Sequence, residues 1–205
     1  MTTGLLILVS APSGAGKTSL VAAALAADEQ LVVSISHTTR PERPGEKNGV
    51  NYHFVQHAAF ESMIESGAFL EHARVFDHHY GTSAGAVAEL RKAGKDVVLE
   101  IDWQGAQQIM SKYPDAVSIF ILPPDVATLR QRLTTRGQDS PEVIERRLAE
   151  AALEISQAPL YGAIIVNKDF SKATQDLLAV IHAARVSTTH QMAHNPSVQA
   201  ILSGQ

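Results

Sequence analysis

The segment SAPSGAGKTS, residues 10–19, combines glycines, a lysine and hydroxyl side chains that could bind phosphate groups. A phosphate cradle needs backbone N–H groups that point inward, a helix N-terminus behind them and a lysine for the outer phosphates. Gly14 and Gly16 let the backbone turn without Cβ clashes, and Lys17 reaches the β- and γ-phosphates in such loops. Thr18 supplies the hydroxyl that coordinates Mg²⁺. The segment therefore predicts a phosphate-binding loop with a nearby metal ion.

The loop departs from the strict pattern G-x-x-x-x-G-K-[ST] at its first position, which is Ala11. This position lies where the preceding strand becomes the loop, before the N–H groups that hold the anion, so a small alanine should fit. The alternative is an ordinary strand–turn–helix connection with chance glycines. A strand, the residues GAGKT and a helix follow one another in the required order, which favours the phosphate loop.

Two carboxylates follow a later apolar run, in the segment VVLEIDWQG. Glu100 and Asp102 are two residues apart, so a strand would place them on the same side. The carboxyl end of a strand in a parallel sheet lies near the ligand crevice. Asp102 could hold Mg²⁺ through water, and Glu100 could support the metal or bind the acceptor. Asp102 could equally cap the next helix, and the two roles are compatible.

A group of polar side chains between residues 36 and 82 could bind a phosphorylated acceptor. The group comprises Ser36, Arg40, Arg43, Tyr52, Glu71, Tyr80 and Thr82. The two arginines and two tyrosine hydroxyls could clamp a phosphate monoester, because guanidinium groups match phosphate oxygens. Glu71 and a hydroxyl could read a base edge. A carboxylate accepts well from adjacent N–H donors, which guanine offers at N1 and N2 and adenine does not.

Five short runs rich in Val, Ile and Leu predict the strands that must position these residues. They are Gly4–Ser10, Leu31–Ser36, Asp96–Ile101, Val117–Leu122 and Ala163–Asn167. None alternates with polar residues, as is typical of parallel strands covered on both faces. Helices are expected at Lys17–Ala27 and Gln175–Ala184, the second with Ser171 upstream as a possible cap. The alternation predicts an α/β layered domain with a parallel sheet.

Two regions interrupt this alternation. Residues 37–90 contain turn residues and short alternating runs at Val50–Val55 and Phe69–Phe76, which indicates a small inserted subdomain with some antiparallel strand. Asp125–Gln157 is expected to form an arginine-rich helical hairpin, with Gly137, Ser140 and Pro141 at its turn. Its second helix carries an apolar stripe made of Ile144, Leu148, Ala151 and Ile155.

Composition narrows the class of protein. The 205 residues are 45% hydrophobic and 19% charged, with a formal net charge of −4 and no cysteine. The negative balance gives no reason to expect nucleic acid as a partner, and thiolate metal sites are excluded. The apolar run Leu5–Val9 is too short to span a bilayer and lacks the flanks of a signal peptide. We therefore expect a cytoplasmic protein that is not bound to a membrane.

The ordered motifs SAPSGAGKTSL, HTTRPERPGEKNGVNYHF, YGTS, EIDWQGA and RLTTRG resemble the bacterial guanylate kinases over almost the full chain. The resemblance implies transfer of a phosphoryl group from ATP, with Mg²⁺, to GMP or dGMP. It also implies a P-loop kinase core with a parallel five-stranded sheet at about 1–36, 91–124 and 160–205. A GMP-binding α+β subdomain would occupy about 37–90 and a helical lid about 125–159. A homo-oligomer is left open.

The resemblance also implies roles for individual residues. ATP would be bound by Ala11, Pro12, Ser13, Gly14, Ala15, Gly16, Lys17, Thr18 and Ser19. GMP would be bound by Ser36, Arg40, Arg43, Tyr52, Glu71, Tyr80, Thr82, Glu100 and Asp102. Lys17, Arg132, Arg136 and Arg147 would act on the transferring phosphoryl group, with Thr18 and Asp102 at the metal. Asn167 matches a position close to the nucleotide. Arg132 and Arg136 are four residues apart and share a helix face, so they could close over ATP together.

Three other functions compete with this interpretation. A kinase for a sugar phosphate such as a ribose bisphosphate would have no need of a guanine reader made of Ser36, Glu71 and Thr82. A guanylate-kinase-like module that binds phosphopeptides would not need an intact Lys17 and Thr18. A regulatory GTPase would carry the motif N-K-x-D, whereas residues 167–170 read NKDF.

Overall fold

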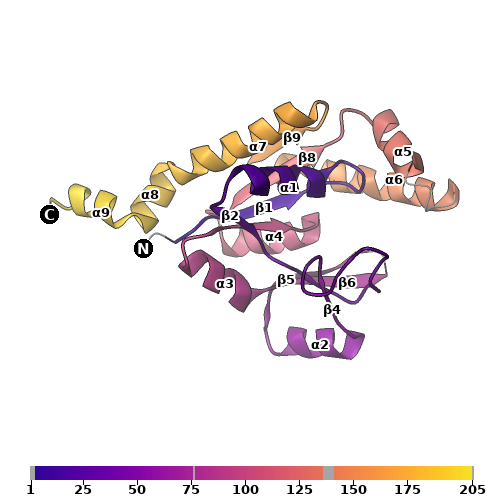
Figure 1. Cartoon of the computed structure of the whole chain (residues 1–205), viewed down its shortest axis with the longest axis horizontal. Helices are drawn as coiled ribbons and strands as arrows, with labels where there is room; N and C mark the ends of the chain where they lie inside the picture. The colour runs from indigo at the N-terminus through magenta and orange to yellow at the C-terminus, as the bar shows by residue number, and fades with distance from the viewer. Residues whose placement is uncertain (1–2, 76, 136–140, 205) are drawn as a thin grey trace.

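The computed structural model describes residues 3–75, 77–135 and 141–204, and it is built around a five-stranded sheet (Figure 1). The strand order is β2-β7-β1-β8-β9, and every neighbouring pair is parallel. These strands are β1 (Leu6–Ser10), β2 (Leu31–Val33), β7 (Asp96–Glu100), β8 (Val117–Leu122) and β9 (Ala163–Val166). The predicted α/β class with a parallel five-stranded sheet is therefore confirmed.

Helices cover both faces of this sheet, and β1 shows how the sequence divides between them (Figure 1). Its odd-numbered residues Ile7 and Val9 pack with helices α1 and α7, whereas the even-numbered Leu6 and Leu8 pack with α3 and α4. Successive side chains of a strand point to opposite faces, so a strand between two helical layers must be apolar throughout. The four helices are α1 (Lys17–Ala27), α3 (Ala84–Lys92), α4 (Trp103–Lys112) and α7 (Phe170–Arg185).

A second, smaller sheet has the order β4-β3-β6-β5 and lies beside helix α2 (His57–Glu65). Its strands are β3 (His37–Thr38), β4 (His53–Phe54), β5 (Phe69–Val75) and β6 (His78–Ser83). The β5–β6 pair is antiparallel, and β5 matches the expected run Phe69–Phe76 except for residue 76, which lies outside the described residues.

The alternating run Val50–Val55 forms less strand than its pattern indicates. Only His53–Phe54 forms a strand there, and it pairs with β3 in parallel. The connection from β3 to β4 runs over residues 39–52, which is long enough to return the chain to the end of the sheet where β3 began. Parallel neighbours need such a long connection, whereas a short turn would have produced an antiparallel hairpin.

Helices α5 (Val126–Thr135) and α6 (Pro141–Ser156) form the expected hairpin and are followed by a 3₁₀ turn, η1 (Ala158–Leu160). The predicted stripe on α6 contributes Ile144, Leu148 and Ala151 to a small cluster of its own with Leu129 and Leu133. Gly137 and Ser140, expected at the turn, lie outside the described residues. The hairpin therefore has an apolar core separate from the clusters on the main sheet.

In the main sheet and the helices that cover it, two element boundaries differ from the sequence-based expectation by three residues or more. Strand β2 ends at Val33 rather than Ser36, because the chain leaves the main sheet there to enter the second one at His37. Helix α7 begins at Phe170, and its cap is Asp169, whose side chain accepts from the Lys172 N–H at 2.7 Å. Ser171, the expected cap, lies inside the first turn.

The C-terminal segment forms two short helices, α8 (Thr188–His194) and α9 (Pro196–Leu202), that extend away from the sheet (Figure 1). Neither contains a buried residue. Among the described helices of the whole chain, none combines the length and the apolar character needed to cross a membrane.

Candidate active site

The predicted phosphate loop connects the carboxyl end of β1 to helix α1. Gly14 and Gly16 have φ angles of 91° and 94°, in the left-handed region that favours glycine. Gly16 is the residue immediately before α1 and has no side chain that could cap the first turn. The N–H groups at this helix end are therefore left for an anion, and the partial positive charge of the helix end favours one.

Side chains outside the loop bind its carbonyl groups. The buried Asn167 donates from Nδ2 to the Ala15 carbonyl at 2.8 Å, and Arg132 donates to the same oxygen at 3.3 Å. Arg132 also donates to the Asn167 carbonyl at 3.4 Å. A Cβ atom at Gly16 would lie 2.5 Å from Asn167 Nδ2. The position therefore requires glycine for two reasons, the positive φ angle and the closeness of the Asn167 side chain. Asn167 thus fixes the loop, a contact that its position in the sequence did not indicate.

Ala11 packs against the apolar cluster between the main sheet and helices α1 and α7. Its methyl group therefore has a place in the core, as expected for the departure from the strict loop pattern. The remaining loop residues from Pro12 to Ser19 line a cavity together with Asp102 and Glu154, except that Ala15 is completely buried.

A second cavity, of about 620 Å³, shares the loop residues Gly14, Gly16 and Ser19 with the first. Its lining residues come from the loop, from α5 and from the segment before and at the start of α7. They are Gly14, Gly16, Ser19, Thr128, Gln131, Arg132, Thr135, Asn167, Lys168 and Phe170. Most of the members from α5 and α7 follow no sequence motif and were therefore not predicted.

The two carboxylates at the end of β7 have different partners. Glu100 accepts from the Thr18 hydroxyl at 2.8 Å. Asp102 caps helix α4, with Oδ1 accepting from the Gly105 N–H at 3.0 Å and Oδ2 from Gln104 Nε2 at 2.9 Å. The capping role proposed for Asp102 is therefore present, whereas its role at a metal stays a prediction.

The oxygen atoms around Thr18 suit an Mg²⁺ ion that is bound together with a nucleotide. No group of three or more acidic or histidine side chains among the described residues could hold a metal ion alone. Mg²⁺ bound with a nucleotide normally takes one or two protein oxygens and completes its shell with phosphate oxygens and water. The Thr18 hydroxyl and the Glu100 carboxylate, side by side at the end of the phosphate loop, fit that requirement.

Seven of the predicted site residues meet in one cavity of about 170 Å³ between the two sheets. They are Lys17, Ser36, Tyr52, Glu71, Tyr80, Glu100 and Asp102, with Val75 and Ile101 completing the lining. The structure thus brings together the phosphate loop, the end of β7 and the second sheet, which are far apart in the sequence.

Glu71 lines this cavity and is only 3% exposed. The Thr82 hydroxyl donates to its Oε1 at 2.5 Å. Burial raises the pKa of Glu71 to about 7, against the lowering effect of the Thr82 hydrogen bond, and the nearby Asp102 raises it further. A carboxylate held in this way can accept from further N–H donors on a ligand.

Arg40 and Arg43 line an adjoining cavity of about 350 Å³, together with Thr18, Tyr52, Tyr80 and Glu100. Arg40 is buried, and it forms a two-point ion pair with Glu46, with distances of 2.8 and 2.9 Å. Its guanidinium also lies over the Tyr52 ring, 5.4 Å from the centroid. Glu46 was not singled out in the sequence, although its carboxylate fixes the orientation of the predicted phosphate clamp.

The structure describes two of the three arginines that were predicted to act from the α5–α6 hairpin. Arg132 contacts the phosphate loop, Arg147 is half-buried on α6, and Arg136 lies outside the described residues.

Glu154, seven residues after Arg147 on the same face of α6, enters the loop cavity. Burial raises the pKa of Glu154 to about 7, opposed by Lys17 and by a hydrogen bond from the Ser13 N–H. Glu154 belongs to no sequence motif, and only its spacing from Arg147 could have indicated it.

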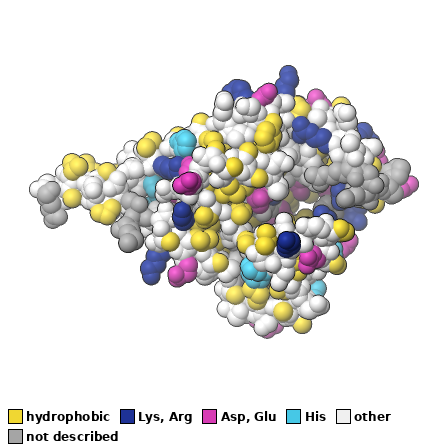
Figure 2. All heavy atoms as spheres, viewed as in Figure 1, with side chains coloured by type: hydrophobic (Ala, Val, Ile, Leu, Met, Phe, Trp, Pro, Cys, Tyr) yellow, Lys and Arg dark blue, Asp and Glu magenta, His cyan; other side chains and the backbone are white. Residues whose placement is uncertain are grey.

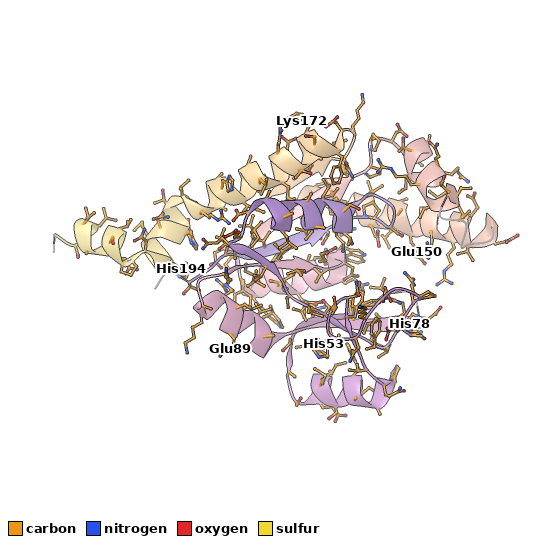
Figure 3. All side chains as sticks on the ribbon, in the orientation of Figure 1. His53, His78, Glu89, Glu150, Lys172 and His194 are labelled. Atoms are coloured by element: carbon orange, nitrogen blue, oxygen red, sulfur yellow. The ribbon has the colours of Figure 1, made fainter. Side chains whose placement is uncertain are left out.

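The three cavities around Lys17 and Thr18 share lining residues and form one continuous site. Lys17 and Asp102 border both the loop cavity and the cavity that holds Glu71, while Thr18 borders the loop cavity and the one with the arginines. Figure 2 shows the surface hollowed between the α5–α6 hairpin and the second sheet, with charged side chains at its edge. Figure 3 shows Glu150 of α6 on the side of this helix that faces the second sheet.

Comparisons with known proteins show which family this chain resembles. A family model described as guanylate kinase matches residues 3–184. A guanylate kinase of Alkalilimnicola ehrlichii is 56% identical over 182 residues, covering 89% of this chain and 90% of that protein. A guanylate kinase of Thiobacillus denitrificans is 54% identical over 189 residues, covering 92% and 90%. The crystal structure of guanylate kinase from Anaplasma phagocytophilum matches with a TM-score of 0.80 at 31% identity, covering 99% of this chain and 96% of that one.

Proposed function

The chain belongs to the guanylate kinase family, and from this membership we propose that it transfers the γ-phosphoryl group of ATP to GMP or dGMP. A phosphate oxygen of the acceptor forms the new bond to the γ-phosphorus, and the bond from that phosphorus to the β–γ bridging oxygen breaks. The products are GDP or dGDP and ADP. The reaction belongs to purine nucleotide metabolism and would recycle GMP.

The observation that carries the proposal is the shared cavity of Lys17 and Glu71. A buried carboxylate can accept from the N1–H and 2-amino groups of guanine together, and the Thr82 hydroxyl holds it in place at 2.5 Å. Ser36 lines the same cavity and would add a third contact to the base. A base held there leaves its phosphate beside Lys17 and the arginine cavity.

Two groups of residues would hold the reacting phosphates. Arg40, Arg43, Tyr52 and Tyr80 would bind the acceptor phosphate in the cavity that they line together. The phosphate loop, from Ala11 to Ser19, would bind the phosphates of ATP through its N–H groups and Lys17. Because phosphoryl transfer depends on alignment and charge neutralisation, this placement would supply most of the catalysis.

The metal ion would be bound between the protein and the phosphates. Thr18 and Glu100 would contribute oxygens, and Asp102 would act through water. When bound, Mg²⁺ neutralises negative charge on the phosphate oxygens of ATP. Lys17 would neutralise charge on the same phosphates from the side of the acceptor cavity.

The division of the chain follows from these roles. A core at about 1–36, 91–124 and 160–205 would bind ATP, and a subdomain at about 37–90 would bind GMP. A lid at about 125–159 would bring Arg132, Arg136 and Arg147 to the transferring group and exclude water, which limits hydrolysis of ATP. A homo-oligomer and a cytoplasmic location stay predictions from the sequence.

The test is ADP formation from ATP and Mg²⁺ with GMP, dGMP, AMP, UMP, CMP or ribose 1,5-bisphosphate as the acceptor. We expect turnover confined to GMP and dGMP. Turnover with ribose 1,5-bisphosphate but not with GMP would favour a kinase for a sugar phosphate. If a folded protein that binds ATP forms no ADP with any acceptor, the result would favour a phosphopeptide-binding module.

A further inference from the structure

We propose that helix α4 positions the guanine reader: Gly105 leaves the space that the Glu71 carboxylate occupies, and Gln108 fixes the strand that carries it. The inference rests on the proposed function, because it takes Glu71 as the residue that binds the base. Gly105 and Gln108 would not touch the nucleotide themselves. They would act as positioning residues for GMP recognition.

Position 105 requires a glycine because there is no room for a side chain, and not because of its backbone conformation. It lies in the first turn of α4 with ordinary helical geometry, so any residue could adopt its conformation. A Cβ atom there would lie 2.2 Å from Oε2 and 2.9 Å from Cδ of Glu71. The surroundings are buried and contain Asp102, so the Glu71 carboxylate could not simply move into solvent. A side chain at position 105 would therefore displace the carboxylate from its place.

Gln108 acts on the backbone of β5, which is the edge strand of the second sheet. Its Nε2 donates to the His72 carbonyl at 2.8 Å, and its Oε1 accepts from the His72 N–H at 3.3 Å. One side chain thus satisfies both backbone groups of His72, as a neighbouring strand would. His72 directly follows Glu71, so these two bonds fix the strand next to the base reader.

Two further side chains of α4 continue the contact in register. Gln104 donates to the Arg74 carbonyl at 3.3 Å, and Lys112 donates to the Leu70 carbonyl at 3.2 Å. Four residues of a helix rise about 6 Å, and two residues of a strand rise about 6.8 Å. The spacing of 104, 108 and 112 on the helix therefore matches that of 74, 72 and 70 on the strand.

The register of this contact decides where Glu71 points. Bonds at residues 70, 72 and 74 use the backbone edge of β5, and the side chains of Glu71 and Val75 both line the base cavity. Residues two or four apart on a strand share a face, and a slip by one residue turns every side chain to the other face. Holding the edge of β5 thus holds Glu71 in the cavity.

Steady-state kinetics of the full chain test this inference with Gly105→Ala and Gln108→Met. The first places a methyl group against the carboxylate, and the second keeps the side-chain length but exchanges no hydrogen bonds with His72. Gln107→Met is the matched control, because Gln107 lies beside Gln108 on α4 and donates instead to Gln157, at 3.2 Å. Each protein is measured with GMP and with inosine monophosphate, which lacks the 2-amino group of guanine.

We expect KM for GMP to rise about tenfold to a hundredfold in both variants, the range for a lost hydrogen bond to a charged group. The preference for GMP over inosine monophosphate should fall by a similar factor. KM for ATP should stay at the wild-type value, since the phosphate loop is unchanged. The control should match the wild type in all three quantities.

The outcomes separate this inference from the proposed function. A wild-type protein that does not use GMP would refute the proposed function before any variant is compared. If the wild type uses GMP and both variants keep its KM for GMP and its preference, the inference is overturned. Equal rises in KM for GMP and ATP with a lower melting temperature would also overturn it, because they indicate general loss of structure. If Gly105→Ala does not fold, Gln108→Met decides by the same criteria.

Discussion

The Thr18 hydroxyl donates a hydrogen bond to the Glu100 carboxylate at 2.8 Å and so joins the start of α1 to the end of β7. The two strands that precede these residues, β1 and β7, are parallel neighbours in the main sheet. Their carboxyl ends therefore meet at one edge, where ligands of such sheets bind. The contact places a metal-binding hydroxyl and a carboxylate together before any phosphate is bound.

Replacing Glu100 with Gln tests this contact. The amide keeps the shape but removes the negative charge that would attract Mg²⁺. We expect the Mg²⁺ concentration for half-maximal activity to rise by about tenfold or more, as for other residues that support a bound metal. Glu89→Gln is the control, since Glu89 is exposed on α3 and distant from the hairpin (Figure 3). An unchanged Mg²⁺ dependence in Glu100→Gln would remove Glu100 from the metal site.

Lys17 should act on the transferring phosphoryl group more than on the binding of GMP. Lys17→Ala is expected to lower kcat by about a hundredfold or more, the usual effect of removing a preorganised charge from a transition state. GMP binding, measured by calorimetry without ATP, should stay close to the wild type because the base contacts Glu71, Thr82 and Ser36 are intact. Wild-type turnover in the variant would refute the role of Lys17.

Glu71 should make GMP recognition depend on pH. Its pKa of about 7 means that the carboxylate is mostly protonated at pH 6 and mostly ionised at pH 8. Only the ionised form accepts from both N1–H and the 2-amino group, so KM for GMP should fall about tenfold as pH rises from 6 to 8. The GMP phosphate also titrates, near pH 6.

Glu71→Gln separates the two titrations. The variant should show a higher KM for GMP, with little change in ATP binding. Any pH dependence that it retains reports the phosphate alone. A variant with the same KM for GMP and the same pH profile as the wild type would exclude Glu71 as the base reader.

The sequence predicted those parts of the fold and the site that depend on local patterns. The apolar run of β1, the glycines of the loop and Lys17 follow one another directly, so their arrangement could be deduced from spacing alone. The parallel pairing of β4 with β3 could not be predicted, because the orientation of a strand depends on where the connection 39–52 returns the chain. The cap of α7 was misplaced because Asp169 and Ser171 both have suitable side chains.

Residues whose roles depend on distant parts of the chain could not be predicted. Gly105 must be small because of Glu71, which is far away in sequence and reaches α4 only when the second sheet packs on it. Glu154 has an unusual environment because α6 brings it to the phosphate loop. Asn167 binds a loop carbonyl that precedes it by most of the chain. In each case the local sequence shows the residue but not its partner.

Glu154 should destabilise the folded protein at neutral and alkaline pH. Its ordinary pKa of 4.5 rises to about 7 on folding because the carboxylate is buried, with Asp102 and Glu150 nearby and only Lys17 and the Ser13 N–H in opposition. Between these values the folded state keeps a proton that the unfolded state has lost. The free energy of unfolding therefore falls as pH rises from about 4.5 to 7, and the loss is complete above 7.

Glu154→Gln removes this titration and should stabilise the protein at pH 8 but not at pH 4, where Glu154 is already neutral. One pKa unit corresponds to ~1.4 kcal/mol, so the rise from 4.5 to about 7 sets an upper limit of roughly 3 kcal/mol on the gain. Urea unfolding at both pH values measures it, with Glu89→Gln as the exposed control. An equal gain at pH 4 and pH 8 would contradict the titration of Glu154, because amide packing alone does not depend on pH.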